Sequence, residues 1–175
     1  VKTTAGLVQG TKENGIYRYL GVPYAEAKER FVPAEKVTPW EGIRMADTYG
    51  PMSPQAQISG VDGEAISSSG DVVVVSVNHR LNVFGYLDLS AYDEKYKYSA
   101  NVGLMDIVDS LKWIQDNIEA FGGDPENVTL FGQSGGGAKV LAMMTSPYAK
   151  GLFEKGIVQS GATETMGVKF NTQES

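Results

Sequence analysis

The chain has 175 residues, 42% of them hydrophobic, which is enough for one domain with a substantial core. Its net charge is −6, and its 15 lysines and arginines form no run, which argues against nucleic acid or an anionic membrane surface as the main partner. The absence of cysteine excludes disulfides and thiolate metal sites. No apolar stretch has the length of a membrane span and the first residues lack a signal-peptide pattern, so we expect a cytoplasmic protein.

The first 42 residues predict a hairpin followed by ordered surface loops. Two runs with strand character, 6–11 and 16–20, flank Asn14-Gly15, the strongest short-range signal for an antiparallel β-hairpin. Residues 43–70 show little periodicity and contain prolines and a Ser-Ser-Ser-Gly cluster. They predict a connector, or a join at which a segment is missing.

From Asp71 onward the pattern alternates between strand and helix. The β-branched run 72–77 predicts a strand buried on both faces of a parallel sheet. Apolar residues then recur at steps of three and four, which predicts the buried face of an amphipathic helix. These residues are Leu104, Ile107, Val108, Leu111, Ile114, Ile118 and Phe121. Asn101 is the expected N-cap of this helix, and Gly122-Gly123 its expected end.

A second strand, a second helix and a third strand follow. We assign them to residues 128–131, 135–145 and 155–160, with Pro147 ending the helix. The order β-α-β-α-β makes these strands parallel, because crossover connections are right-handed. We therefore expect residues 1–175 to form a single α/β domain, with a mostly parallel sheet, flanking helices and an N-terminal antiparallel hairpin.

The turn between the second strand and the second helix reads Gly132-Gln133-Ser134-Gly135-Gly136. A serine between glycines at a strand-to-helix turn is how an α/β-hydrolase presents its nucleophile. The turn is tight enough to strain the backbone of the serine, and neighbours with Cβ atoms are expected to collide there. The helix that follows directs its free N–H groups and positive dipole end at the reacting centre.

We expect no metal and no cofactor. Asp106 and Asp109 lie near the start of the first predicted helix, where carboxylates complement the helix dipole, so we do not expect them to form a metal pair. The glycines at 135–137 are reminiscent of a phosphate-binding loop. However, their spacing does not fit the dinucleotide fingerprint, and Lys139 is wrongly placed for a P-loop.

With these residues the chain resembles the type-B carboxylesterase family, which also contains the cholinesterases, and most of all its bacterial members. The most specific match is Phe121-Gly122-Gly123-Asp124-Pro125 just before the serine turn. The other matches, in family order over nearly the whole chain, are 21–25, 30–31, 39–42, 71–78, 80–87, 101–106, 113–114 and 117–118. The resemblance implies part of an α/β-hydrolase fold and a small-molecule carboxylic ester as substrate.

The resemblance also implies roles for the residues of the turn. Ser134 matches the nucleophile that carries the acyl group, and the N–H of Gly135 matches one donor of the oxyanion hole. Gly132, Gln133 and Gly136 match the residues that support the nucleophile elbow. This chain has Gln133 where the family often has Glu, and Gly135 where it often has Ala.

Two departures from the family pattern are larger. The His-Gly-Gly-Gly loop that supplies further oxyanion donors is absent, and residues 57–62 have the character of a splice across that gap. After Ser134 there is no histidine, and the acidic residues there, Glu154, Glu164 and Glu174, lie in no recognisable acid motif. We therefore expect an incomplete domain that lacks its C-terminal part, and an isolated polypeptide that is nearly inert.

His79, the single histidine, comes just after the predicted strand 72–77. Because it precedes the serine and has no partner motif, we expect a packing role and not catalysis. Two functions remain: a serine carboxylic-ester hydrolase whose base and acid lie outside this sequence, and a catalytically silent, cholinesterase-like binding or adhesion module. The intact serine turn favours the first. The oligomeric state is left open.

Overall fold

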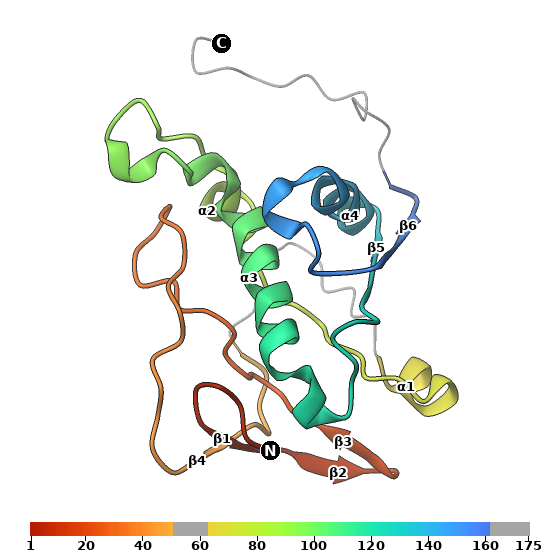
Figure 1. Cartoon of the computed structure of the whole chain (residues 1–175). Coiled ribbons are helices and arrows are strands. Elements are labelled where there is room, and N and C mark those ends of the chain that lie inside the picture. The colour runs from red at the N-terminus through yellow and green to blue at the C-terminus, as the bar shows by residue number, and fades with distance from the viewer. Residues whose placement is uncertain (51–62, 162–175) are drawn as a thin grey trace.

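A computed structural model describes residues 1–50 and 63–161 (Figure 1). The strands are β1 (Leu7–Gln9), β2 (Thr11–Glu13), β3 (Ile16–Arg18), β4 (Ile43–Met45), β5 (Thr129–Gln133) and β6 (Lys155–Gln159). The α-helices are α1 (Glu64–Gly70), α2 (Val83–Tyr86), α3 (Val102–Asn117) and α4 (Gly135–Thr145). Short 3-10 turns are η1 (Glu94–Tyr96), η2 (Ser99–Asn101), η3 (Ile118–Phe121) and η4 (Pro147–Ala149). The predicted splice at 57–62 lies outside the described residues.

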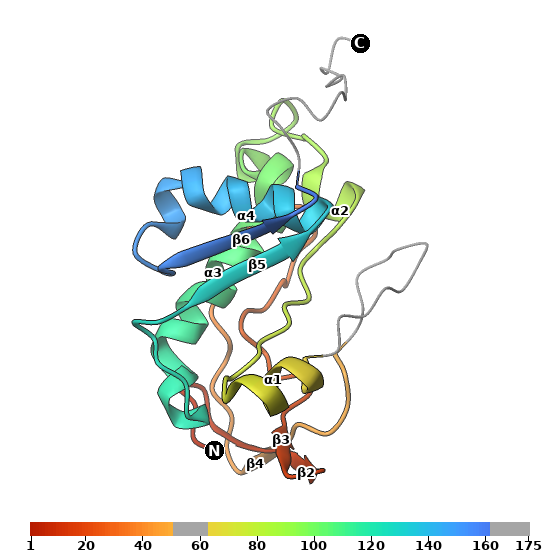
Figure 2. The same cartoon turned by 90° about the vertical axis from the view of Figure 1, so that its right-hand side faces the viewer.

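The described strands pair in twos. β5 and β6 are parallel, as predicted, and α4 lies against one face of this pair (Figure 2). β2 and β3 form the predicted antiparallel hairpin, whose turn residues Asn14 and Gly15 both have positive φ. β1 instead pairs in parallel with β4, so the run 6–11 is divided between two sheets.

The prediction of a buried strand at 72–77 is wrong for the described structure. Residues 72–80 are extended but carry no strand assignment, and Val72, Val73 and Val75 are 40–47% exposed. A β-branched run becomes a strand only when neighbouring strands accept its backbone hydrogen bonds. No strand of the described part of the chain pairs with this segment, so its local preference for strand is not fulfilled.

The main hydrophobic core forms around α3. The predicted apolar face is confirmed: Ile107, Leu111 and Ile114 are each under 10% exposed and pack with Met143 of α4 and with Ala149. Burial of side chains of this size stabilises a fold by roughly 1.5–3 kcal/mol each. α3 begins directly after Asn101, although the Asn101 side chain makes no cap hydrogen bond. η3 continues the helix to Gly122, whose left-handed φ of 88° stops it.

Asp106 of α3 forms a buried ion pair with Arg80. The sequence predicts a different role for it, in which its carboxylate complements the helix dipole. Its two carboxylate oxygens accept hydrogen bonds from Arg80 Nη2 at 2.6 Å and Nε at 2.8 Å, and the Arg80 backbone N–H donates to it at 2.9 Å. The remaining guanidinium nitrogen donates to the carbonyl of Val32 at 2.7 Å. The arginine side chain therefore joins three segments that are distant in sequence: the N-terminal loops, the extended segment 72–80 and α3.

α4 approaches the β5–β6 pair closely because glycine lines the contact. A Cβ at Gly137 would lie 2.9 Å from Gly161 Cα and 3.2 Å from the carbonyl oxygen of Gln159. A Cβ at the neighbouring Gly136 would meet nothing within 4 Å. Of these two adjacent glycines, the packing therefore requires glycine at position 137 and would accept a side chain at position 136.

Replacing Asp106 with Asn should lower the free energy of unfolding by about 3 kcal/mol, because the Arg80 guanidinium would stay buried without its counter-charge. The matched control is Asp109→Asn on the same helix. Asp109 pairs with Lys112, which is 57% exposed, so this loss should stay below about 1 kcal/mol. Urea unfolding of the two variants measures both values, and equal losses would show that the Arg80–Asp106 pair is not a special anchor.

Gly137→Ala should lower the free energy of unfolding by roughly 1–3 kcal/mol, since the added methyl group meets backbone atoms that cannot rotate away. Gly136→Ala should instead raise it by roughly 0.5–1 kcal/mol, because alanine is the better helix former and the space is open. The urea midpoints of the two variants provide the test. Similar shifts in the same direction would contradict the close packing of α4 on the sheet.

Candidate active site

Ser134 forms a sharp elbow between the last residue of β5 and the first of α4. Its φ and ψ are 55° and −119°, a combination that a residue with a side chain rarely adopts and that costs roughly 1–3 kcal/mol. Two hydrogen bonds maintain it. The Ser134 N–H donates to the carbonyl of Gln159 on β6 at 2.8 Å, and its own carbonyl accepts from the Ala138 N–H at 3.1 Å. The strained turn that the sequence predicts is present, and the serine is exposed.

The glycines around the serine contribute unequally. A Cβ at Gly132 would lie 2.4 Å from the carbonyl carbon and oxygen of Gly136, so the expected crowding is confirmed at position 132. The expectation of crowding is wrong at Gly135 and Gly136, because a Cβ there meets nothing closer than 3.8 Å. Sequence reasoning missed Gly137, which is the second glycine that the packing requires. Its signal was a third consecutive glycine at the start of a helix.

The start of α4 lies directly after the serine. Gly135 is the first helical residue, and N–H groups of a first turn have no acceptor within their own helix. The positive end of the helix dipole lies at the same place. Both favour negative charge next to the Ser134 side chain. Gln133 pairs with Gln159 in the β5–β6 register, which aligns the two strand ends below the elbow.

The described residues do not complete a catalytic triad. No side chain in residues 1–50 and 63–161 forms a hydrogen bond with Ser134 Oγ. Glu154 donates its backbone N–H to Val128 at 2.9 Å and lies just before β6. Since β5 and β6 are parallel, this glutamate is at the opposite end of the strands from the serine. Glu164 and Glu174 lie outside the described residues.

His79 is half-buried at the end of the extended segment 72–80. Burial lowers the pKa of its imidazole to about 4, and the nearby Lys139 ammonium adds to the effect. An imidazole with so low a pKa is a weak proton acceptor at neutral pH.

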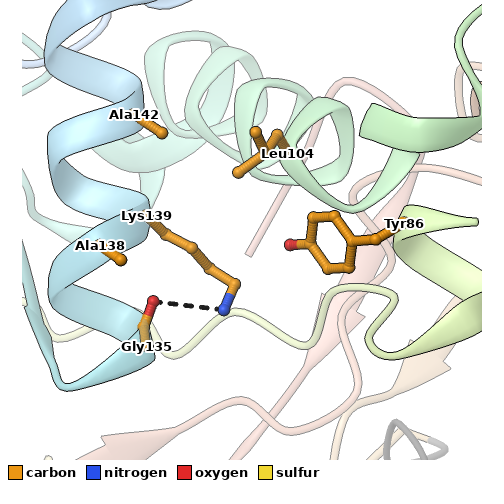
Figure 3. Close-up of a pocket in the computed structure, with 6 residues that line it drawn as sticks. All are labelled: Tyr86, Leu104, Gly135, Ala138, Lys139 and Ala142. Carbon is orange, nitrogen blue, oxygen red and sulfur yellow. Dashed lines mark hydrogen bonds between the residues drawn. The ribbon is translucent and has the colours of Figure 1, made fainter. Parts of the chain in front are cut away.

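A hollow of about 310 Å³ opens beside the elbow (Figure 3). It is lined by Tyr86, Leu104, Gly135, Ala138, Lys139 and Ala142. The Lys139 ammonium donates to the Gly135 carbonyl at 3.3 Å, and burial lowers its pKa. The buried Tyr86 hydroxyl has no hydrogen-bond partner among the described residues. Sequence reasoning assigned no role to either side chain, because their meeting depends on how α2 and α4 pack.

Within the described residues, no three or more His, Cys, Asp or Glu side chains group in a way that could hold a metal ion. None of the helices there is both long enough and apolar enough to cross a membrane.

Known proteins resemble this chain in sequence and in structure. A model of the carboxylesterase family matches residues 1–61 and 56–174. Para-nitrobenzyl esterase of Bacillus subtilis (strain 168) is 36% identical, over 95% of this chain and 44% of the relative. Phenmedipham hydrolase of Pseudarthrobacter oxydans is 33% identical, over 90% of this chain and 42% of the relative. The chain therefore spans less than half the length of the relatives that it matches.

The solved structures agree with the sequence relatives. A PNB esterase superposes with a TM-score of 0.87 at 38% identity, over 95% of this chain and 44% of that one. An esterase from anaerobic Clostridium hathewayi gives a TM-score of 0.84 at 40% identity, over 90% of this chain and 42% of that one. The predicted fold class, a partial α/β-hydrolase fold, is confirmed. The resemblance inferred from the sequence is confirmed as well, and the chain belongs to the carboxylesterase family.

Proposed function

We propose that this chain carries the nucleophile of a serine hydrolase that acts on small-molecule carboxylic esters. The observation that carries the proposal is the strained backbone of Ser134 at the exposed junction of β5 and α4. A fold keeps such strain where a side chain must be presented to a ligand. A binding module has no need of it, which favours the hydrolase over a catalytically silent relative.

In the proposed reaction, Ser134 Oγ attacks the ester carbonyl carbon and its proton passes to a base. The carbonyl oxygen becomes negative in the tetrahedral intermediate, where the Gly135 N–H donates to it. One such donor is worth roughly 3 kcal/mol of transition-state stabilisation. Collapse of the intermediate expels the alcohol and leaves the acyl group on Ser134. Water then attacks this acyl-enzyme, releases the carboxylic acid and restores the serine.

The base, the acid and the remaining oxyanion donors are proposed to lie outside this sequence. The absence of any histidine after Ser134 supports this, as does coverage of only 44% of para-nitrobenzyl esterase. The family model matches in two ranges that meet at 56–61, which supports an internal gap close to the predicted splice at 57–62. A cytoplasmic location stays a prediction of the sequence.

A chimera tests the nucleophile directly. Residues 128–145, which contain β5, the elbow and α4, replace the matching segment of para-nitrobenzyl esterase, whose remaining chain supplies the missing groups. A fluorophosphonate should add one adduct to the transplanted Ser134, and Ser134→Ala should abolish it. The 175-residue chain alone should react on the order of 10⁴-fold more slowly, because it lacks the triad partners.

The control variant in this chimera is Thr145→Ala, which removes an exposed hydroxyl at the other end of α4 and should be labelled like the unmodified chimera. Intact mass and peptide mapping locate the adduct, and circular dichroism checks the fold. A folded chimera that is neither labelled nor active would reject the proposal and favour the silent binding module.

We propose that His79 has a structural role. Its pKa of about 4 in the folded chain lies below its ordinary 6.5, so the unfolded chain binds a proton at this site first. The stability that comes from burying neutral His79 is therefore complete above pH 6.5 and is lost as the pH falls toward 4. The loss is at most about 3 kcal/mol. In His79→Gln this contribution should vanish.

Urea unfolding of both chains at pH 7 and at pH 4.5 measures the effect. The stability of the unmodified chain relative to His79→Gln should decrease at the lower pH. Parallel stability curves would show that His79 is not protected from protonation by the fold.

A further inference from the structure

The hollow beside the elbow presents two hydrogen-bond donors that face each other from different elements. Lys139 extends into it from α4 and Tyr86 from the end of α2 (Figure 3). An ammonium group has three N–H donors, and the Gly135 carbonyl, at 3.3 Å, accepts one of them. Lys139 forms no ion pair with a carboxylate in the described part of the chain. The Tyr86 hydroxyl is buried and has no partner there. Buried donors of this kind normally have an acceptor.

The charges around the hollow favour an anion as that acceptor. The Asp106 carboxylate acts on the Tyr86 hydroxyl electrostatically, and both of its oxygens are bound by Arg80. The pKa of His79 is about 4, so this side chain is uncharged at neutral pH. Burial raises the pKa of Tyr86 to about 12, which keeps its hydroxyl a donor. Within residues 1–50 and 63–161, the ammonium of Lys139 is thus a half-buried positive charge that no carboxylate pairs with, in a chain whose net charge is −6.

The size of the hollow and its position connect it to the proposed reaction. Its volume of about 310 Å³ suits a small group, and Leu104, Ala138 and Ala142 give it apolar walls. Gly135 lines it and directly follows Ser134, so one small molecule can place an ester carbonyl at the serine and a second group in the hollow.

We propose that Lys139 and Tyr86 together bind a carboxylate, and that the preferred substrate is a half-ester of a short dicarboxylic acid. The substrate part of this inference rests on the proposed function, whereas the carboxylate site stands without it. Lys139 and Tyr86 are specificity residues here: they hold the free carboxylate while the short apolar chain lies against the alanine and leucine walls.

Glutarate is the probe for the site, and glutaramide is its neutral counterpart of the same shape. Amide NMR spectra of the 175-residue chain should show saturable shifts with glutarate at residues 135–142 and at Tyr86. Glutaramide should bind at least roughly tenfold more weakly, since a hydrogen bond to a charged group is the stronger one. Lys139→Met, which keeps the apolar stem, should weaken glutarate binding by a similar factor, and Tyr86→Phe should weaken it by several-fold.

The matched control is Lys150→Met. It removes an exposed lysine that follows η4, beyond the end of α4, and this variant should bind glutarate as the unmodified chain does. Unaltered spectra of the free variants show that they are folded. Equal binding of glutarate and glutaramide, or undiminished binding by Lys139→Met, would overturn the carboxylate site.

The substrate class is tested separately in the chimera described above, with Tyr86 also introduced at its matching position. It should hydrolyse 4-nitrophenyl hydrogen glutarate with a kcat/KM at least roughly tenfold above that for 4-nitrophenyl pentanoate, and Lys139→Met should remove this preference. A labelled, active chimera without the preference would reject the substrate class alone. A chimera that is not labelled would reject the proposed function, and the glutarate arm would still decide the carboxylate site.

Discussion

The Arg80–Asp106 pair holds the described structure together at its centre. One guanidinium bonds both oxygens of a buried carboxylate on α3 and the carbonyl of Val32 in the N-terminal loops. The Arg80 side chain is 16% exposed, and the Asp106 side chain is 5% exposed. Desolvating two charges is costly, so the pair contributes less to net stability than to fixing one arrangement of the segments that it joins.

The parts of the candidate active site depend on that arrangement. The carbonyl of Arg80 lies against α2 and α3 at Gly85 and Gly103, where no Cβ intervenes. This close approach places Tyr86, the last residue of α2, beside the start of α3. His79 precedes Arg80 and is fixed with it. The wall of the hollow that faces α4 is therefore positioned by a residue that is itself far from the serine in sequence.

The elbow has a second and separate support. Its backbone is strained, and a hydrogen bond from Ser134 to Gln159 on β6 holds it in place. α4 approaches the same strands through Gly132 and Gly137, where a Cβ would meet backbone atoms. The serine is thus presented by a rigid strand–helix junction, whereas the hollow beside it is built from elements that meet only through tertiary contacts.

The sequence by itself determined the features that depend on neighbouring residues. The hairpin at Asn14-Gly15, the buried face of α3, the end of α3 near Gly122 and the elbow at Ser134 all follow from turn chemistry and periodicity, which act within a few residues. The family also followed from such local motifs. Only the tertiary structure decided which partner each local preference would meet. Among the described residues, it left the run 72–77 without a paired strand, paired Asp106 with Arg80 and brought Lys139 to face Tyr86. Strand pairing, burial and charge compensation join residues that are distant in the chain. Local sequence patterns do not show which distant residues will meet.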